Sequence, residues 1–126
     1  MLGFEDARGT LFFEYARVLN ECKPKAFIFE NVRNLVNHDK GKTFQVIQNT
    51  FKELGYKIFY QVLNASDFGI PQTRRRIFIV GFREDVKDFQ FPEPVPLTTT
   101  VQDLLEREVD EKYFLHQGFI DNYVLA

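Results

Sequence analysis

The chain has 126 residues, of which 44% are hydrophobic and 27% charged, a composition that fits one globular domain or part of one. Its formal net charge of −2 excludes a general basic coat for nucleic acid, so any such contact must come from a local patch. The single cysteine, Cys22, excludes an internal disulfide and fits a reducing cytoplasm, and no apolar run reaches the length of a membrane span.

The first predicted element is a helix that begins near Arg8, where Asp6 can cap it, and ends before Pro24. Apolar residues recur along it at helical spacing, at Leu11, Tyr15, Val18, Leu19 and Cys22. Cys22 is therefore interpreted as a small core residue rather than a nucleophile. The apolar run 26–29 then predicts a short strand that is buried on both faces, as in a parallel sheet.

A second helix is predicted over 42–54, and Gly55 stands where a helix-ending glycine belongs. Its predicted core face consists of Phe44, Ile47, Phe51 and Leu54. Strands are predicted over 56–63 and 76–82, with a loop at 67–73 that contains glycine and proline.

After the last of these strands the chain becomes rich in proline. Three prolines within 89–97 exclude a regular element there. Thr100 and Asp103 resemble a capping box at the start of a short helix. The order helix–strand–helix–strand–strand–short helix defines an α/β fold.

Glu30 is the first candidate for chemistry, because it ends the predicted strand within the sequence Phe29-Glu30-Asn31-Val32. Ligands of open α/β sheets bind beyond the carboxyl ends of the strands. Apolar neighbours there would disfavour the charged carboxylate, so that the group could donate a proton at neutral pH. The alternative is a solvated glutamate at a strand end, with Asn31 starting a turn.

A second candidate is the run Gln72-Thr73-Arg74-Arg75-Arg76 at the entry to the last strand. Alternation along a strand would send Arg74 and Arg76 to one side and Arg75 to the other. Two guanidinium groups on one side form a fork for phosphate or for a base carbonyl. The alternative is an edge strand whose charges oppose aggregation.

The segment 3–12 by itself indicates only a capped helix start. His38 and His116 have no Cys or His at metal-ligand spacing, so no metal site is predicted. The sequence also lacks a glycine-rich strand–turn–helix motif that could hold a cofactor.

In this order, the three features resemble the cytosine-5 DNA methyltransferases of bacterial restriction–modification systems. The segment 3–12 resembles the family's D-x-R-G-x-L-F block, and 29–35, reading F-E-N-V-R-N-L, resembles its E-N-V block. The segment 69–81, reading G-I-P-Q-T-R-R-R-I-F-I-V-G, resembles the P-Q-x-R-x-R block, and residues 91–94 and 100–105 fit the segment that follows.

The resemblance implies that a cytosine is flipped out of DNA, attacked at C6 by a cysteine thiolate and methylated at C5 by S-adenosylmethionine. Glu30 would bind the N3 and amino edge of the base and supply a proton. Arg76 would reach the base carbonyl and help to hold Glu30. Asn31, Gln72 and Arg74 would belong to the substrate-binding set, with Arg74 serving the pocket or a phosphate.

The same resemblance would place Leu11 against the adenine of S-adenosylmethionine, whereas Arg75 occupies a variable position and receives no role. The implied fold is a partial Rossmann-like, S-adenosylmethionine-dependent methyltransferase fold, a mixed sheet of three strands with flanking helices. Its last strand, 76–82, would run in reverse between the other two. Residues 1–88 would form the C-terminal part of the catalytic domain, and 89–126 a proline-rich connector toward a target-recognition region.

The family's Pro-Cys-Gln nucleophile loop and F-x-G-x-G cofactor loop are absent from these 126 residues. The chain alone is therefore expected to be inactive, to bind no S-adenosylmethionine by itself, and to need an N-terminal half in order to act on double-stranded DNA. The alternative is a non-catalytic DNA-binding or partner subunit of a split methyltransferase.

Without that half, strand 26–29 would expose an unpaired edge, and the first helix an uncovered apolar face. A homo-oligomer that buries either feature is expected, unless the tail from Lys112 folds back over the strand.

Overall fold

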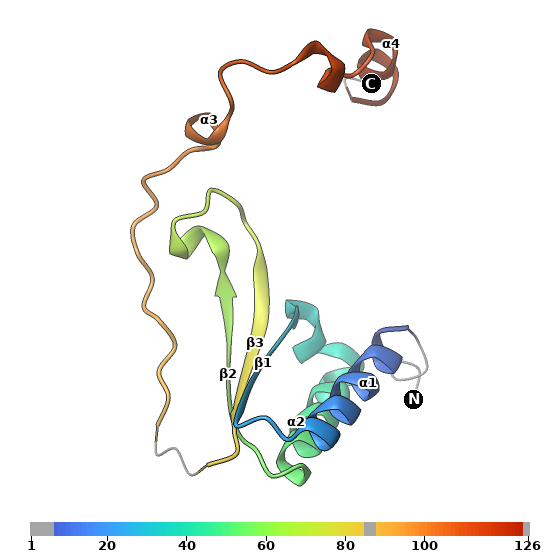
Figure 1. Cartoon of the computed structure of the whole chain (residues 1–126), viewed down its shortest axis with the longest axis vertical. Coiled ribbons are helices and arrows are strands. Elements are labelled where there is room, and N and C mark those ends of the chain that lie inside the picture. Colours follow the sequence, from blue (N-terminus) through green and yellow to red (C-terminus); the bar gives the residue numbers. More distant parts are fainter. Residues whose placement is uncertain (1–6, 85–87, 125–126) are drawn as a thin grey trace.

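The structure, a computed structural model, describes residues 7–84 and 88–124. Its main body consists, in chain order, of α1 (Ala7–Cys22), β1 (Ala26–Val32), α2 (Lys42–Glu53), β2 (Lys57–Asn64) and β3 (Arg75–Phe82) (Figure 1). This is the predicted α/β order. The bounds lie within about a residue of the expected ones, except that β1 continues three residues beyond the predicted 26–29. The predicted cap of the first helix, Asp6, lies outside the described residues.

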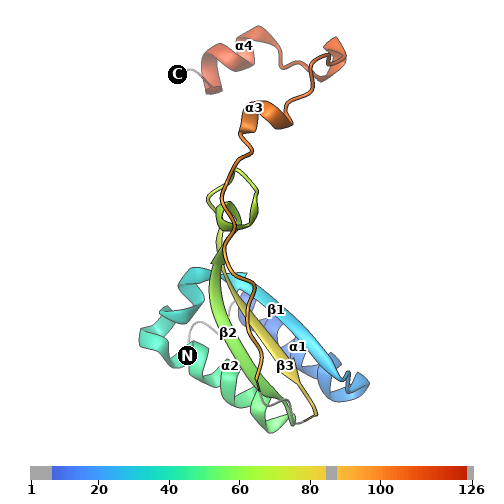
Figure 2. The same cartoon turned by 90° about the vertical axis from the view of Figure 1, so that its left-hand side faces the viewer.

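The sheet confirms the predicted strand arrangement, with the order β1-β3-β2. β3 is antiparallel to both neighbours, so β1 and β2 run parallel to each other with the reversed strand between them. Both helices cover one face of this sheet, and the chain after β3 crosses the opposite face (Figures 1 and 2). The carboxyl end of β1 therefore meets the beginning of β3 at one end of the sheet.

The hydrophobic core lies between the sheet and the two helices. The predicted core face of α2 is confirmed, because Phe51 is fully buried and Phe44 and Ile47 are 7% and 2% exposed. Phe27 of β1 packs against Phe51 with ring centroids 4.6 Å apart. Gly55 ends the helix with a φ of 95°, as its position predicted, since glycine adopts this conformation without steric cost.

The predicted apolar face of α1 is partly wrong. Phe12 and Leu19 are buried, whereas Leu11 is 68% and Val18 46% exposed, and Cys22 is exposed rather than a core residue. The helix carries apolar residues on more than one side, and the side that packs is the one that places Phe12 against the Phe51 ring, with centroids 5.6 Å apart.

β1 is also not buried on both faces, contrary to the sequence expectation. Phe27 and Phe29 point into the core, but Ile28 between them is 67% exposed. β1 is an edge strand of the sheet. On its free edge the Tyr15 hydroxyl donates a hydrogen bond of 2.7 Å to the carbonyl oxygen of Ile28. A side chain of α1 thus satisfies one backbone acceptor that would otherwise pair with a further strand.

Beyond β3 the chain is extended and packs its aromatic residues on the open face of the sheet. The Phe89 ring lies 5.9 Å from Phe59 and 5.6 Å from Phe82. The amide of Val95 donates to the carbonyl oxygen of Asp67, 2.7 Å away, which ties this segment to the loop between β2 and β3. This segment contains no regular element, as its prolines predicted.

The short helix α3 (Val101–Leu104) begins with the predicted capping box of Thr100 and Asp103. The remaining short turns, including α4 (Gln117–Phe119), lie apart from the sheet in both views (Figures 1 and 2). The described part of the tail, residues 112–124, does not cover β1 in either view, so that alternative is wrong for the described residues. No helix in the described part of the chain is long and apolar enough to cross a membrane.

Candidate active site

Glu30 and Arg76 form an ion pair at the end of the sheet where β1 finishes and β3 begins. Glu30 faces Phe78 and Val32 faces Arg76 in the register of these strands, so Glu30 and Arg76 are diagonal neighbours on one face. Nε of Arg76 lies 3.1 Å from Oε1 of Glu30. The salt bridge leaves one edge of the carboxyl available to a ligand.

The environment of Glu30 differs from the apolar burial that was expected. Its side chain is 43% exposed and that of Arg76 26% exposed. The difference arises because Glu30 points to the open face of the sheet, which only the extended segment after β3 crosses.

The two side chains line a cavity of about 410 Å³, here called the Glu30 cavity. Its lining combines polar residues with apolar ones: Glu30, Asn64, Arg74 and Arg76, and Leu63, Ala65, Phe68, Phe78 and Pro92. A cavity of this size suits a small planar ring held by a few polar groups. Three predicted site residues, Glu30, Arg74 and Arg76, therefore share one cavity.

Asn64 is a functional candidate that the sequence reasoning missed. Its Oδ1 accepts hydrogen bonds from the backbone amides of Ser66, at 3.3 Å, and Arg74, at 3.0 Å. The amide of Ala65 in turn donates to the carbonyl oxygen of Arg74 at 3.0 Å. These bonds close the loop between β2 and β3 and fix where Arg74 enters the cavity. The signal was an Asn directly after an apolar strand, a position where its side chain often caps a turn.

A second cavity, of about 560 Å³, lies on the other side of Glu30 and is here called the Leu11 cavity. Leu11 and Asn31 line it together with Glu30, Tyr15 and Ile28. Oδ1 of Asn31 accepts a hydrogen bond from the amide of Val32 at 2.7 Å, which orients the Asn31 side chain. Glu30 therefore stands between the cavity with the arginines and the cavity with Leu11.

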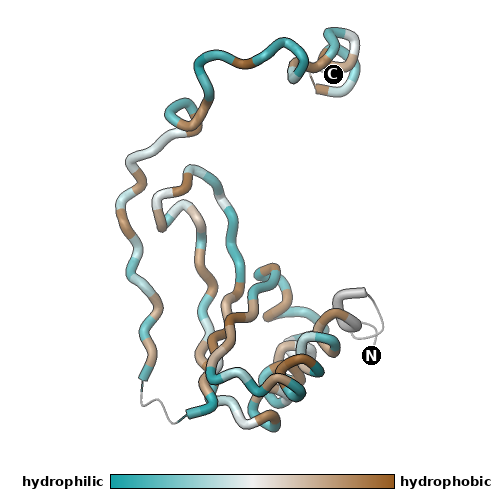
Figure 3. The backbone as a smooth tube through the Cα atoms, in the orientation of Figure 1, coloured by the Kyte–Doolittle hydropathy of each residue, from teal (hydrophilic) through white to brown (hydrophobic). Residues whose placement is uncertain are grey.

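Gln72 is the predicted site residue that the structure does not bring to either cavity. It lies in the loop before β3 and is exposed, and its backbone N–H donates to the carbonyl oxygen of Ile70 at 2.7 Å. Figure 3 shows the hydrophilic entry to β3 and the more hydrophobic strand that follows it.

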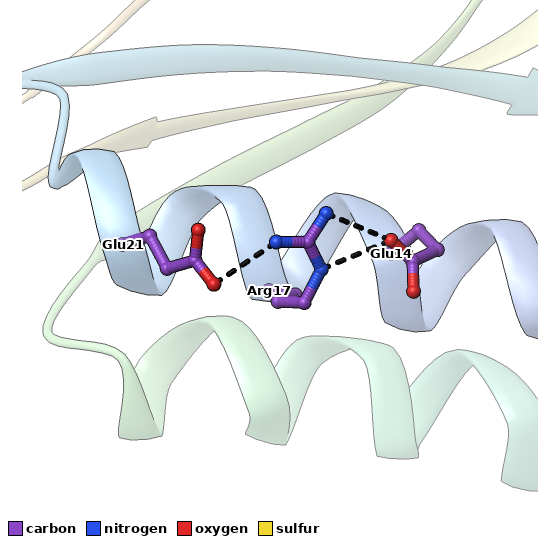
Figure 4. Close-up of polar contacts among 3 residues, drawn as sticks. All are labelled: Glu14, Arg17 and Glu21. Atoms are coloured by element: carbon purple, nitrogen blue, oxygen red, sulfur yellow. Dashed lines mark hydrogen bonds and ion pairs between the residues drawn. The ribbon is translucent and has the colours of Figure 1, made fainter.

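A further group of charged side chains lies along α1, where Glu14 also lines the Leu11 cavity. Arg17 bridges Glu14 and Glu21 on the outer side of α1, with N–O distances of 3.0 and 2.9 Å (Figure 4). Such exposed pairs contribute little to stability. Among the described residues, no three His, Cys, Asp or Glu side chains are grouped so that they could hold a metal ion.

The fold is that of known methyltransferases. A prophage-encoded protein of E. coli, described as a DNA modification methyltransferase, superposes with a TM-score of 0.65 and 26% identity over 83% of this chain and 32% of its own. The S. pombe Dnmt2 methyltransferase, at 18% identity, shows the same fold with a TM-score of 0.61 over 90% of this chain and 39% of its own.

The chain belongs to the C-5 cytosine-specific DNA methylase family, whose family model matches residues 1–125. It is 54% identical over 117 residues to the type II methyltransferase M.SsoII of Shigella sonnei, covering 90% of this chain and 31% of that protein. It is 50% identical over 126 residues to M1.ScrFI of Lactococcus lactis subsp. cremoris, covering 97% of this chain and 32% of that protein. The chain thus spans about a third of the length of these relatives.

Proposed function

We propose that this chain forms the cytosine-binding side of the active site of an enzyme that methylates C5 of cytosine in DNA. The observation that carries the proposal is the Glu30–Arg76 pair at 3.1 Å in the wall of the Glu30 cavity. Glu30 presents an acceptor or an acid to the amino group and N3 of cytosine, and Arg76 presents a cation to the carbonyl oxygen of the base.

Glu30 would act as the acid of the reaction. Attack of a thiolate at C6 of the ring places negative charge on the base, and a proton delivered to N3 neutralises it. Arg76 would hold the Glu30 carboxyl through its Nε and turn the rest of its guanidinium toward the base carbonyl. Arg74, at the same wall, would serve the base or its phosphate.

Asn31 and Gln72 would complete the substrate-binding set in different ways. Asn31 follows Glu30 directly and is held by its bond to the Val32 amide, so it would fix the direction in which the strand ends. Gln72 is exposed in the loop before β3, from which it would reach DNA rather than the flipped base.

S-adenosylmethionine would supply the methyl group, and the Leu11 cavity is the candidate for its adenine. The fit rests on Leu11 itself, an apolar side chain that is 68% exposed at the rim of a cavity reaching Glu30. A planar adenine packed there would cover this surface. One wall alone would bind weakly, so we expect the 126-residue chain to have no measurable affinity for the cofactor by itself.

The nucleophile is expected to come from outside these residues. Cys22, the single cysteine, is exposed near the end of α1 and follows Glu21 rather than a proline. It does not line the Glu30 cavity. We therefore propose that the chain alone is inactive and acts together with a segment that carries the thiolate and the cofactor loop.

Labelled S-adenosylmethionine and mixed-sequence duplex DNA test the proposal. The 126-residue chain alone should give background incorporation, and the chain combined with the nucleophile-bearing half should place label on C5 of cytosine. Incorporation by the chain alone above a no-protein control would contradict the inactivity. Label on a position other than C5 in the combined enzyme would contradict the assigned reaction.

A further inference from the structure

A third cavity of the molecule contains the arginine to which the active-site proposal gives no role. It has a volume of about 370 Å³ and is here called the Arg75 cavity. It is lined by Val32, Arg33, Asn34, Thr73, Arg75 and Arg76. Its position follows from strand alternation, which turns Arg75 away from the Glu30 cavity toward the short 3-10 helix Arg33–Val36 that continues β1.

The Arg75 cavity is electropositive, because it is lined by three arginines, of which Arg76 is paired with Glu30. Arg33 and Arg75 are exposed, and neither forms an ion pair with a residue that the structure describes. No carboxylate is among the residues that line the cavity. Because like charges that share a cavity repel each other, this arrangement favours a bound anion.

The donor set of the cavity matches a phosphate group. Guanidinium groups bind phosphate oxygens through paired N–H donors, more specifically than an ammonium does. Asn34 and Thr73 also line the cavity, and their side-chain amide and hydroxyl groups are neutral donors. Three of the lining residues come from the end of β1 and its continuation, and three from the loop and strand that begin β3, so the site depends on the folded sheet end.

We propose that Arg33 and Arg75 bind a backbone phosphate of the DNA strand next to the nucleotide held in the Glu30 cavity. This inference rests on the proposed function, since it requires DNA at the Glu30 cavity. Arg76 lines both cavities, and Arg75 precedes it on β3. A DNA strand whose nucleotide enters the Glu30 cavity therefore places the neighbouring phosphates beside this end of the sheet. Such a contact positions DNA without reading its sequence.

The salt dependence of DNA binding tests the site in the 126-residue chain. A short fluorescein-labelled duplex is titrated by fluorescence anisotropy between about 50 and 200 mM salt. The plot of log K against log salt has a negative slope. Arg33→Gln and Arg75→Gln should each make this slope less steep by about 0.9, the value for one lost phosphate contact. Arg107→Gln, which removes one exposed arginine from the separate C-terminal region, is the matched control and should leave the slope unchanged.

Several outcomes would overturn the inference. Equal slopes for the parent and both variants, an equal loss in Arg107→Gln, or absence of DNA binding by the parent would each do so. Side-chain NMR can monitor the binding of inorganic phosphate at Arg33 and Arg75. If phosphate binds there but the two substitutions do not change DNA binding, the cavity is a site for free anions instead. Unchanged circular dichroism of the variants excludes unfolding. The methylation test of the combined enzyme is separate. If the combined enzyme labels C5 but the salt slopes of both variants equal the parent's, this phosphate site alone is rejected. If the slopes change as expected but the combined enzyme does not label C5, the proposed reaction alone is rejected.

Discussion

Gly81 is the position where a single added methyl group should disturb the sheet most. It faces Phe27 in the register of β1 and β3. A Cβ atom at Gly81 would lie 2.7 Å from Cε1 of Phe27 and still closer to the ring atoms Cε2 and Cζ. Carbon atoms in favourable contact are about 3.5–4.0 Å apart, so the ring would have to move by on the order of 1 Å.

Phe27 has little room for this movement. Its ring already lies 4.6 Å from Phe51 and 4.9 Å from Tyr56, centroid to centroid, within the core. Overpacking of this kind costs about 1–3 kcal/mol. In a domain of this size, each kcal/mol lowers the melting temperature by roughly 4–8 °C. Gly81→Ala should therefore melt well below the parent chain.

Denaturant unfolding followed by circular dichroism measures this loss, and a double substitution gives the decisive control. Phe27→Leu shortens the ring that the new methyl group would strike, so Gly81→Ala should cost much less in the Phe27→Leu background. Gly118→Ala, whose Cβ would meet only the His116 ring at 3.2 Å in the exposed C-terminal part, should be nearly neutral. A loss for Gly81→Ala that is the same in both backgrounds would refute the packing of β1 against β3.

Three further predictions concern α1, the capping box and assembly. Burial raises the pKa of Tyr15 above its ordinary 10.0, so folding stability should fall as the pH rises through that value, where the unfolded chain loses the proton first. Tyr15→Phe should lower the free energy of unfolding by about 0.5–1.5 kcal/mol, because the hydrogen bond to Ile28 is lost. It should also abolish the fall in stability that Tyr15 causes at alkaline pH, and thermal melts at a series of alkaline pH values would measure both effects. The backbone amide of Thr100, and then its hydroxyl, lower the pKa of Asp103, so Thr100→Ala should bring that pKa part of the way back in an NMR titration, and an unchanged value would contradict the cap. The free edge of β1 with Ile28 67% exposed should drive the isolated chain to a dimer or larger assembly in light scattering, whereas a monodisperse monomer would reject this expectation.

The secondary structure could be predicted from the sequence because each element carries its own local signal. The period of Phe44, Ile47 and Phe51 identified α2, and Thr100 with Asp103 identified the start of α3. The reversed placement of β3 came from the family resemblance, since periodicity contains no information on strand order.

The errors arose where burial depends on neighbours that the local pattern does not specify. Leu11 and Phe12 are adjacent apolar residues of α1, and the positions of α2 and β1 decide that Phe12 is the buried one. Ile28 alternates with buried phenylalanines, yet it stays 67% exposed because no described element packs over its side of the strand. Pairing of Glu30 with Arg76 could be inferred from the family blocks, but the open face that leaves Glu30 43% exposed could not.

The rate of methyl transfer by a Glu30→Gln variant tests the central claim most directly. The measurement requires the active enzyme that contains this chain, with labelled S-adenosylmethionine and DNA. Glutamine keeps the shape and a hydrogen-bond donor but cannot pass a proton, so kcat should fall by about 10²–10⁴-fold while the Kd for DNA changes little. Glu53→Gln, at the exposed end of α2, is the matched control and should retain the parent rate. A Glu30→Gln enzyme that methylates cytosine near the parent rate would contradict the role of Glu30 as the acid of the reaction.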